Sequence, residues 1–407
     1  MQDRENNRYR YRGRYRYQNG RHPSVVSIPI PIAIAIATDT SDAEAGLPRS
    51  LWRKGTVGAM GWKSEIRNPK SEIPLLLHSP AMYEFERETA VEIVAEVCNL
   101  TRRVQDGIVA ASDALTKGDR SPVTLADLAA QVVVSLRLAQ RFPDDPLLAE
   151  EDSAALAESP EMADRVLELT REHISALTRD EMVAALDRGD HRGGGAGRYW
   201  VLDPIDGTKG FLRGDQYAVA LALVADGDVV VGVLGCPNLP AVGQAADRGS
   251  LFSAVRGSGA LSHSLDGAIG DAIHVDVITD PADAVVCESV VAAHAAHSVQ
   301  AGIADRLGIS APPYRIDSQC KYAVVARGEA SIYLRLPRDT SYREKVWDHA
   351  AGVVVVEEAG GRVTDLDGRP LDFSEGRLLG NHRGIVCSNG AIHDRVLEAC
   401  RAELNLD

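Results

Sequence analysis

The chain of 407 residues has few cysteines, and no two of them form a Cys-x-x-Cys pair. This spacing disfavours both a structural zinc site and a disulfide framework. We therefore expect reduced, mostly buried thiols in a cytoplasmic protein. The cysteines are Cys98, Cys236, Cys287, Cys320, Cys387 and Cys400.

The sequence also lacks the patterns of a membrane span, a P-loop and a cysteine-based phosphatase loop. The longest apolar run, Ile28 to Ala37, is interrupted by prolines and is shorter than the ~20 residues that a membrane span needs. The glycine-rich run from Gly193 to Gly197 is not followed by Gly-Lys-Ser/Thr, so it is not a P-loop. We interpret that run as a flexible hinge, with anion binding as the alternative. No Cys-x5-Arg phosphatase loop is evident, so a phosphocysteine route is not expected.

Charge is distributed unevenly along the chain, whose net charge is −14. Residues 1–81 carry 13 Lys and Arg against 7 Asp and Glu, whereas the remainder carries 31 against 51. Binding of long nucleic acids requires phosphate neutralisation by basic side chains, so the acidic body argues against it. A small anionic substrate is compatible with this body only where local cations offset the field.

The basic head, residues 1–81, does not read as a folded domain. Arg and Tyr alternate from Arg8 to Tyr17, and a polar stretch follows Ala37. A secretory leader is one alternative, but the long basic stretch and the prolines argue against it. An RNA-binding arm is another. We favour a disordered or artefactual extension, with Met82 as the natural start.

After Met82, helical and strand-like patterns alternate, which is typical of an α/β fold. We expect helices at about 91–111, 124–138, 162–177, 298–307, 319–326, 348–360 and 391–404. Strands are expected at about 147–149, 217–225, 229–234, 251–256, 285–289, 314–317, 332–336, 362–365 and 384–388. Thr124 is a plausible N-cap, which would place Asp127 in the first helical turn.

The stretch from Trp200 to Phe211 carries the strongest chemical signal. An apolar strand runs into a turn in which Asp203 and Asp206 flank Pro204 and Ile205, and Gly207 and Thr208 follow. Carboxylate and carbonyl oxygens are the ligands that Mg²⁺ prefers, and backbone N–H groups at a helix start can bind an anion. The structural alternative is an ordinary turn built from Asp, Pro and Gly.

This stretch closely resembles the signature of the lithium-sensitive, Mg-dependent phosphomonoesterases of the inositol monophosphatase superfamily. Its extension, Gly207 to Tyr217, is most similar to the 3′(2′),5′-bisphosphate nucleotidases. The resemblance covers Glu84 to about Cys400. It implies an α/β (α+β) fold, a layered αβαβα sandwich with two sub-domains. Residues 82–265 would hold the metal site, and residues 266–407 would hold the nucleotide-binding residues.

The same resemblance assigns roles to acids from well-separated parts of the chain. It implies one Mg²⁺ on Glu150, Asp203 and the Ile205 carbonyl, and a second on Asp203, Asp206 and Asp348, with two or three ions in total. Asp127 and Glu150 would hold the attacking water, and Thr208, hydrogen-bonded to Asp127, would align it. Ala149 stands where the family commonly has Gly. The structural alternatives are a solvated charge run at 150–152 and an N-cap role for Asp348. If the acids converge, repulsion at 4 Å is about 4 kcal/mol per pair at an effective dielectric near 20, so bound cations or raised pKa values are required.

Substrate contacts are implied in the same way. The N–H groups of Gly207 and Thr208 would hold the phosphate, and Ser318, Lys321, Arg335 and His294 would contact the nucleotide. As structural alternatives, Lys321 would be a lysine on a helix surface, Arg335 an arginine at a strand edge, and His294 a histidine with a purely structural role. His297 is a second candidate for the histidine contact.

The implied reaction is hydrolysis of adenosine 3′,5′-bisphosphate to AMP and phosphate, with 3′-phosphoadenylyl sulfate as a second substrate and inhibition by Li⁺ and Na⁺. One alternative is an inositol mono- or polyphosphate phosphatase with the same metal site. Another is a non-enzymatic RNA-binding protein that acts through its basic head. We expect no nucleic-acid or membrane partner, and a monomer or homodimer.

Overall fold

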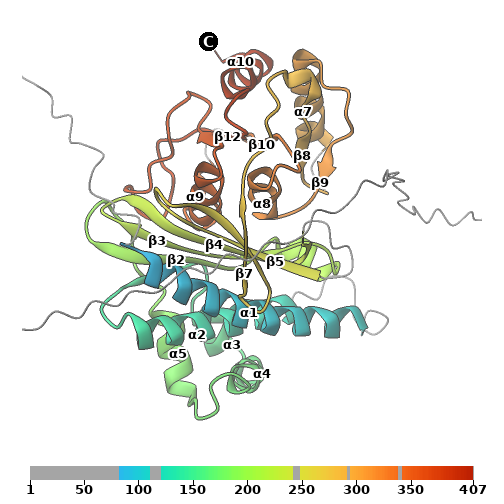
Figure 1. Ribbon diagram of the computed structural model, residues 1–407. Coiled ribbons are helices and arrows are strands. Elements are labelled where there is room, and N and C mark those ends of the chain that lie inside the picture. Colours follow the sequence, from blue (N-terminus) through green and yellow to red (C-terminus); the bar gives the residue numbers. More distant parts are fainter. Residues whose placement is uncertain (1–81, 111–120, 242–247, 291–293, 338–341, 407) are drawn as a thin grey trace, which may run out of the picture. The chain divides into compact units, whose positions relative to one another are not determined.

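The computed structural model describes residues 82–110, 121–241, 248–290, 294–337 and 342–406 (Figure 1). The interpretations of the basic head therefore lie outside the described residues. The described residues all belong to one compact unit. The helices are α1 (Glu84–Ala110), α2 (Ser121–Arg141), α3 (Ala154–Glu158), α4 (Pro160–Arg171), α5 (Arg179–Asp187), α6 (Thr208–Leu212), the 3₁₀ turn η1 (Pro281–Asp283), α7 (His294–Leu307), α8 (Cys320–Ala326), α9 (Ala350–Glu358) and α10 (His393–Glu403).

The first sheet has seven strands in the order of the sequence. Its first two strands are parallel, and every other neighbouring pair is antiparallel. Asp226 and Gly227, with φ of 50° and 90°, form the hairpin turn between β3 and β4. The strands are β1 (Leu147–Ala149), β2 (Arg198–Asp206), β3 (Ala218–Ala225), β4 (Asp228–Pro240), β5 (Arg248–Val255), β6 (Gly259–Ser264) and β7 (Ile269–Ile273).

The second sheet has five strands in the order β11-β12-β10-β8-β9. Strand β8 is parallel to β10 and β9, whereas β12 is antiparallel to β10 and β11. This sheet lies in the second part of the chain, after β7 has closed the first sheet. Its strands are β8 (Val286–Glu288), β9 (Tyr314–Arg315), β10 (Ile332–Arg335), β11 (Arg362–Thr364) and β12 (Ile385–Ser388).

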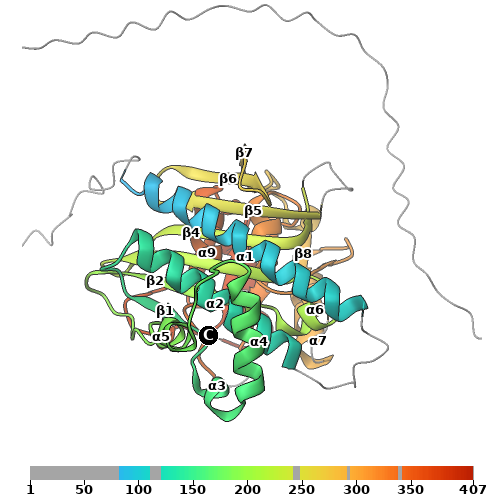
Figure 2. The same cartoon turned by 90° about the horizontal axis from the view of Figure 1, so that it is seen from below.

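Strand alternation builds three apolar cores. Along β2, Trp200 and Leu202 face one core, while Tyr199 and Val201 face the next. Helices α1 and α2 cover the first face, α8 and α9 lie between the two sheets, and α7 and α10 cover the far face of the second sheet (Figures 1 and 2). The predicted αβαβα sandwich is therefore confirmed.

Close packing fixes α9 against the first sheet. A Cβ on Gly232 of β4 would lie 2.7 Å from the carbonyl oxygen of Ala351. A Cβ on Gly352 would lie 2.2 Å from the ring of Tyr322 on α8. These glycines let the helix approach the strand and its neighbouring helix closely, so the residues at its N-terminal end have a fixed position.

Several local expectations can now be compared with the structure. All six cysteines are free and buried, as predicted. The cap at Thr124 is wrong, because α2 begins at Ser121 and Thr124 lies inside its first turn. Pro122 explains the earlier start, since proline is favoured at the first helical positions. Helix α2 is also long and apolar enough to cross a membrane, but 72% of its apolar window is buried inside the protein, as in a core helix.

Candidate active site

The acids predicted from separate motifs converge at one end of the first sheet. Strands β1 and β2 are parallel, with Ala149 paired to Leu202, so Glu150 and Asp203 follow at the same end of neighbouring strands. The pairing register of β2 with β3 shifts between Asp203 and Asp206. The negative charges of Glu150, Asp206, Asp348 and Asp127 all act on Asp203. Four segments of the chain therefore contribute carboxylates to one cluster.

Asp203 lies at the centre of this cluster and is 1% exposed. Burial, followed by the charges of the neighbouring acids, raises its pKa well above the usual value. Its Oδ1 atom is buried and has no hydrogen-bond partner within the described part of the chain. A buried carboxylate oxygen without a donor is costly unless a cation satisfies it. The donor set, which consists of carboxylates, suits Mg²⁺.

Glu150 and Asp348 occupy the rim of the cluster. Glu150 is partly exposed to solvent. The surrounding protein still removes part of its solvation, and the negative charges of Glu151, Asp348 and Asp206 act in the same direction. Together these effects raise the pKa of Glu150 to about 7. Burial and the charges of Asp206 and Glu344 raise the pKa of Asp348 to about 7 against the opposing effect of Arg335. The pKa of Asp127 is raised well above its usual value by burial, then by Glu151 and Glu150.

These pKa values predict a pH-dependent response to Mg²⁺. Glu150 and Asp348 titrate near pH 7 in the folded protein, against 4.5 and 3.8 as reference values, so only the folded state retains their protons between those limits. The stability of the metal-free protein should therefore fall as the pH rises through 7. Metal binding requires these protons to leave, so the rise in thermal midpoint on adding Mg²⁺ should grow from pH 6.5 to pH 8.

Thermal melts with Mg²⁺ and with EDTA at each pH measure this difference. Burial lowers the pKa values of His263, His349 and His393 to about 4. These three histidines therefore make the protein more stable as the pH rises toward 6.5, which is opposite to the effect of Glu150 and Asp348. Their reference value is 6.5, so measurement above that pH avoids their titration. An increase in midpoint that is the same at pH 6.5 and pH 8 would contradict the prediction.

The turn after β2 lies against the second part of the chain. Gly207 has φ of +95°, and a Cβ on it would lie 2.8 Å from the Cβ of Ser318. Ser318 is itself in the left-handed region, with φ of +67°. Thr208 begins α6 and is exposed, and within the described residues it makes no hydrogen bond to Asp127. The structure therefore brings Gly207 and Ser318 together, and the alignment of water by Thr208 stays a prediction.

Lys321 is buried on α8, so it is not the surface lysine of the structural alternative. Its Nζ lies 3.3 Å from the hydroxyl of Ser289 and 5.3 Å from the ring centroid of Tyr333. Burial lowers its pKa, while the charge of Asp206 acts against this shift. A buried cation therefore lies near the acid cluster, where it could meet an anionic ligand.

Arg335, at the end of β10, contacts two carboxylates. Its Nε lies 2.7 Å from Glu344 Oε2, and its Nη2 lies 3.0 Å from Asp348 Oδ2. The N-cap role of Asp348 is wrong, because α9 begins at Ala350 with His349 as the N-cap residue. The Asp348 carboxylate is bonded to Arg335 instead. Among the remaining predicted contacts, the side chains of His294 and His297 lie outside the described part of the structure.

Two positioning residues were missed by the sequence reasoning. Gln319 donates its backbone N–H to Asp206 Oδ2 at 2.5 Å, and its side chain bridges the carbonyl of Trp347 and the N–H of Gly352. It thereby connects the end of β2 to the segment that carries Asp348. Arg377 donates to the carbonyl of Ala149 at 2.6 Å and stacks on Trp347. Gln319 lies between the predicted contacts Ser318 and Lys321, whereas nothing in the local sequence marks Arg377.

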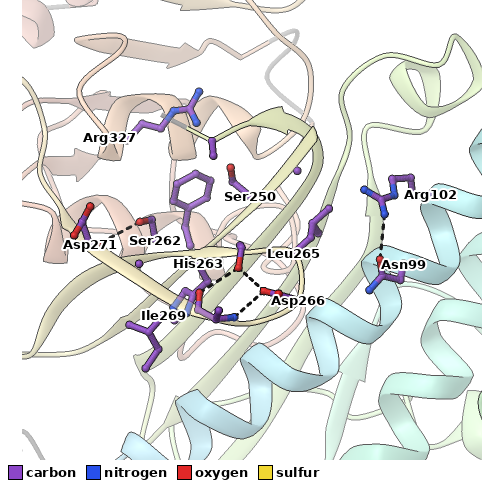
Figure 3. A pocket seen from close by; sticks show the side chains of 16 residues that line it. Asn99, Arg102, Ser250, Ser262, His263, Leu265, Asp266, Ile269, Asp271 and Arg327 are labelled. Carbon is purple, nitrogen blue, oxygen red and sulfur yellow. Dashed lines mark hydrogen bonds between the residues drawn. The ribbon is translucent and has the colours of Figure 1, made fainter. Parts of the chain in front are cut away.

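Two cavities help to locate the ligand site. One of about 500 Å³ adjoins the acid cluster and is lined by Glu150, Glu151, Asp152, Leu186, Asp187, Gly189, Asp190, Arg192 and Arg377. Another, of about 720 Å³, lies between α1 and the strands β5 to β7, with Arg102, His263 and Arg327 in its wall (Figure 3). The larger cavity contains none of the predicted site residues, so we place the candidate site at the acid cluster.

Comparisons with known proteins identify the family. Residues 81–405 match the model of the inositol monophosphatase family. A 3′(2′),5′-bisphosphate nucleotidase from Schizosaccharomyces pombe is 42% identical over 343 residues, covering 80% of this chain and 97% of that protein. One from Oryza sativa is 44% identical over 337 residues, covering 78% and 94% respectively.

Solved structures support the fold alone. SuhB from Mycobacterium tuberculosis matches with a TM-score of 0.51 and 22% identity, covering 79% of this chain and 98% of that one. The extragenic suppressor protein suhB from Bartonella henselae also gives 0.51, with 20% identity over 77% and 97% of the two chains. The family match and the sequence relatives confirm the resemblance carried by Trp200 to Phe211. The chain belongs to the inositol monophosphatase family and, within it, to the 3′(2′),5′-bisphosphate nucleotidases.

Proposed function

We propose that the protein is a metal-dependent phosphomonoesterase that removes the 3′-phosphate of adenosine 3′,5′-bisphosphate, giving AMP and phosphate. 3′-Phosphoadenylyl sulfate is the proposed second substrate. The observation that carries the proposal is the cluster of Glu150, Asp203, Asp206, Asp348 and Asp127, in which the buried Oδ1 of Asp203 has no partner among the described residues. The nucleotidases that share over 40% of their residues with this chain support the substrate class.

The residues fit two or three Mg²⁺ ions. Glu150, Asp203 and the carbonyl of Ile205 would hold one ion, and Asp203, Asp206 and Asp348 a second. When bound, Mg²⁺ supplies a more acidic water and neutralises charge on the entering and leaving oxygens. Monoester hydrolysis is among the slowest uncatalysed reactions, with accelerations reaching ~10²¹, so this type of assistance is needed.

The chain's own groups complete the site. Asp127 is buried beside Glu150, and its raised pKa suits a carboxyl that takes up a proton from the attacking water. We propose that the turn at Gly207 and Thr208 holds the phosphate through its N–H groups. Ser318 lies against Gly207, and Lys321 follows it at the start of α8, and we propose that both contact the nucleotide.

Phosphate release from adenosine 3′,5′-bisphosphate tests the proposal directly. The purified full chain with Mg²⁺ should produce AMP and phosphate in equal amounts, and EDTA should abolish this. Li⁺ and Na⁺ should inhibit it, as the family resemblance implies. Inositol monophosphate is the competing substrate. The buried cation Lys321 favours the nucleotide, so a higher kcat/KM on the inositol phosphate would defeat the proposal.

We also propose a cytoplasmic location, which the free, buried cysteines suit because a reducing compartment keeps thiols reduced. Fractionation of cells that produce the protein from its natural gene checks this. Recovery in a secreted or membrane fraction would contradict it.

A further inference from the structure

Three buried residues beside the acid cluster, Glu344, His349 and Tyr322, have no role in the proposed function. Glu344, Asp348 and His349 each offer a ligand atom, and these atoms lie within 4.8 Å of one another. By geometry alone this group could hold a metal ion. However, the guanidinium of Arg335 is bonded to both Glu344 and Asp348. A cation is therefore already present between these carboxylates, and it belongs to the protein.

The oxygen of Glu344 that contacts Arg335 is also contacted by buried His349, which is itself bonded to buried Tyr322. His349 Nε2 lies 3.3 Å from Glu344 Oε2, and His349 Nδ1 lies 2.8 Å from the hydroxyl of Tyr322. The carboxylate of Glu344 can only accept, so Nε2 of His349 carries the proton that it donates there, and Nδ1 continues the network to the hydroxyl of Tyr322.

Glu344 remains ionised despite its burial. Loss of solvation opposes ionisation, but the hydrogen bond from His349 and the charge of Arg335 outweigh it and lower the pKa of Glu344 to about 2. Arg335 thus has a permanent anionic partner that is independent of Asp348. The end of the guanidinium that faces Asp348 is fixed by the bond at the other end.

We propose that Glu344, supported by His349 and Tyr322, is a positioning residue that neutralises and orients Arg335, and thereby leaves Asp348 available to a divalent cation. This inference rests on the proposed function, in which Asp348 is a metal ligand. Without the charge of Glu344, Asp348 becomes the remaining anionic partner of Arg335 in this network. The ion pair between Arg335 and Asp348 would become stronger, and the guanidinium, whose charge would no longer be compensated by Glu344, would repel a divalent ion. Both effects weaken metal binding.

The test measures metal affinity without substrate. Mn²⁺ serves as the probe, with free Mn²⁺ followed by electron paramagnetic resonance, and Mg²⁺ binding is followed by calorimetry. Glu344→Gln should weaken binding by about ten- to a hundredfold, as is usual when a residue that orients a metal ligand is lost. Tyr322→Phe removes only a hydroxyl, so it should also weaken metal binding, but by less. If Glu344→Gln does not fold, the metal affinity of Tyr322→Phe tests the proposal in its place.

Glu288→Gln is the matched control. Glu288 is buried to a similar degree, on β8 of the sheet that carries Arg335, and its Oε1 lies 2.8 Å from Arg315 Nε, but it is not part of the acid cluster. Equal weakening in both variants would overturn the proposal, because loss of any buried ion pair would then suffice. Unchanged metal affinity in folded Glu344→Gln would overturn it as well.

A double-mutant cycle separates an effect through Arg335 from a direct one. Arg335→Gln should bind Mn²⁺ more tightly than the wild type, since Asp348 is released, while its KM for the nucleotide rises. In that background Glu344→Gln should change affinity by less than about threefold, because the residue through which it acts is gone. A full effect of Glu344→Gln in the Arg335→Gln background would contradict the proposal. None of these binding measurements depends on turnover, so a failure of the proposed reaction would be seen separately.

Discussion

Replacing Asp203 with asparagine is expected to lower kcat by about a thousandfold. Asp203 is the acid at the centre of the cluster, and both proposed metal positions use it. A bound metal contributes several kcal/mol of transition-state stabilisation, and each 1.4 kcal/mol corresponds to a factor of ten. Steady-state phosphate release at saturating Mg²⁺ measures the loss, and Mn²⁺ binding should be lost with it.

The same variant should not be less stable than the wild type in EDTA. The wild-type carboxyl is buried, its pKa is raised, and Oδ1 has no partner in the described residues. Asparagine removes a charge that the metal-free protein does not compensate, so its thermal midpoint at pH 8 should equal or exceed that of the wild type. Retained activity, or a midpoint well below the wild type, would contradict this assignment of Asp203.

Asp365→Asn provides the contrasting control. Asp365 is also fully buried, but it accepts hydrogen bonds from Asp367, Arg369 and His382 at 2.9 to 3.0 Å. Losing its charge should lower stability by about 1–3 kcal/mol, because its donors lose their partner. Its kcat should be unchanged below the melting temperature. The two variants therefore separate an acid kept for a ligand from an acid kept for the fold.

Replacing Gly207 with alanine is expected to have the second-largest effect, a loss of about a hundredfold in kcat. The residue has φ of +95°, and the new Cβ would lie 2.8 Å from the Cβ of Ser318. The turn must therefore shift, and a displacement of about 1 Å at a reacting group can cost 10²-fold. Mn²⁺ affinity should change far less than kcat, because the metal-binding acids of β2 precede the turn.

Gly257→Ala is the control for backbone strain. Gly257 has φ of +81°, but a Cβ there would meet nothing within 4 Å. The substitution should cost about 1–2 kcal/mol of stability from the unfavourable φ and leave kcat intact. If Gly207→Ala behaves in the same way, the spacing between the turn and Ser318 has no part in the reaction. Thermal melts and phosphate release on both variants decide this.

The sequence by itself located most of the strands and helices and named the acids that the structure brings together, but it did not indicate α3, α5, β6 or β7. Strand alternation at Tyr199 to Leu202 and the spacing of Asp203, Pro204 and Asp206 are local patterns, and local patterns specify strands and turns directly. The two misplaced caps have different causes. Pro122 begins α2 earlier than the expected cap, which is a local effect, whereas the carboxylate of Asp348 is bonded to Arg335 on a different element.

Only the tertiary structure decided which groups hold the acids in place. The side chain of Gln319 spans Trp347 and Gly352, and Arg335 lies between Glu344 and Asp348, through bonds that join separate elements. No periodicity in the sequence encodes such pairs, because each depends on how two elements pack. A glutamate or a glutamine looks like any other polar residue until the fold buries it and gives it a partner.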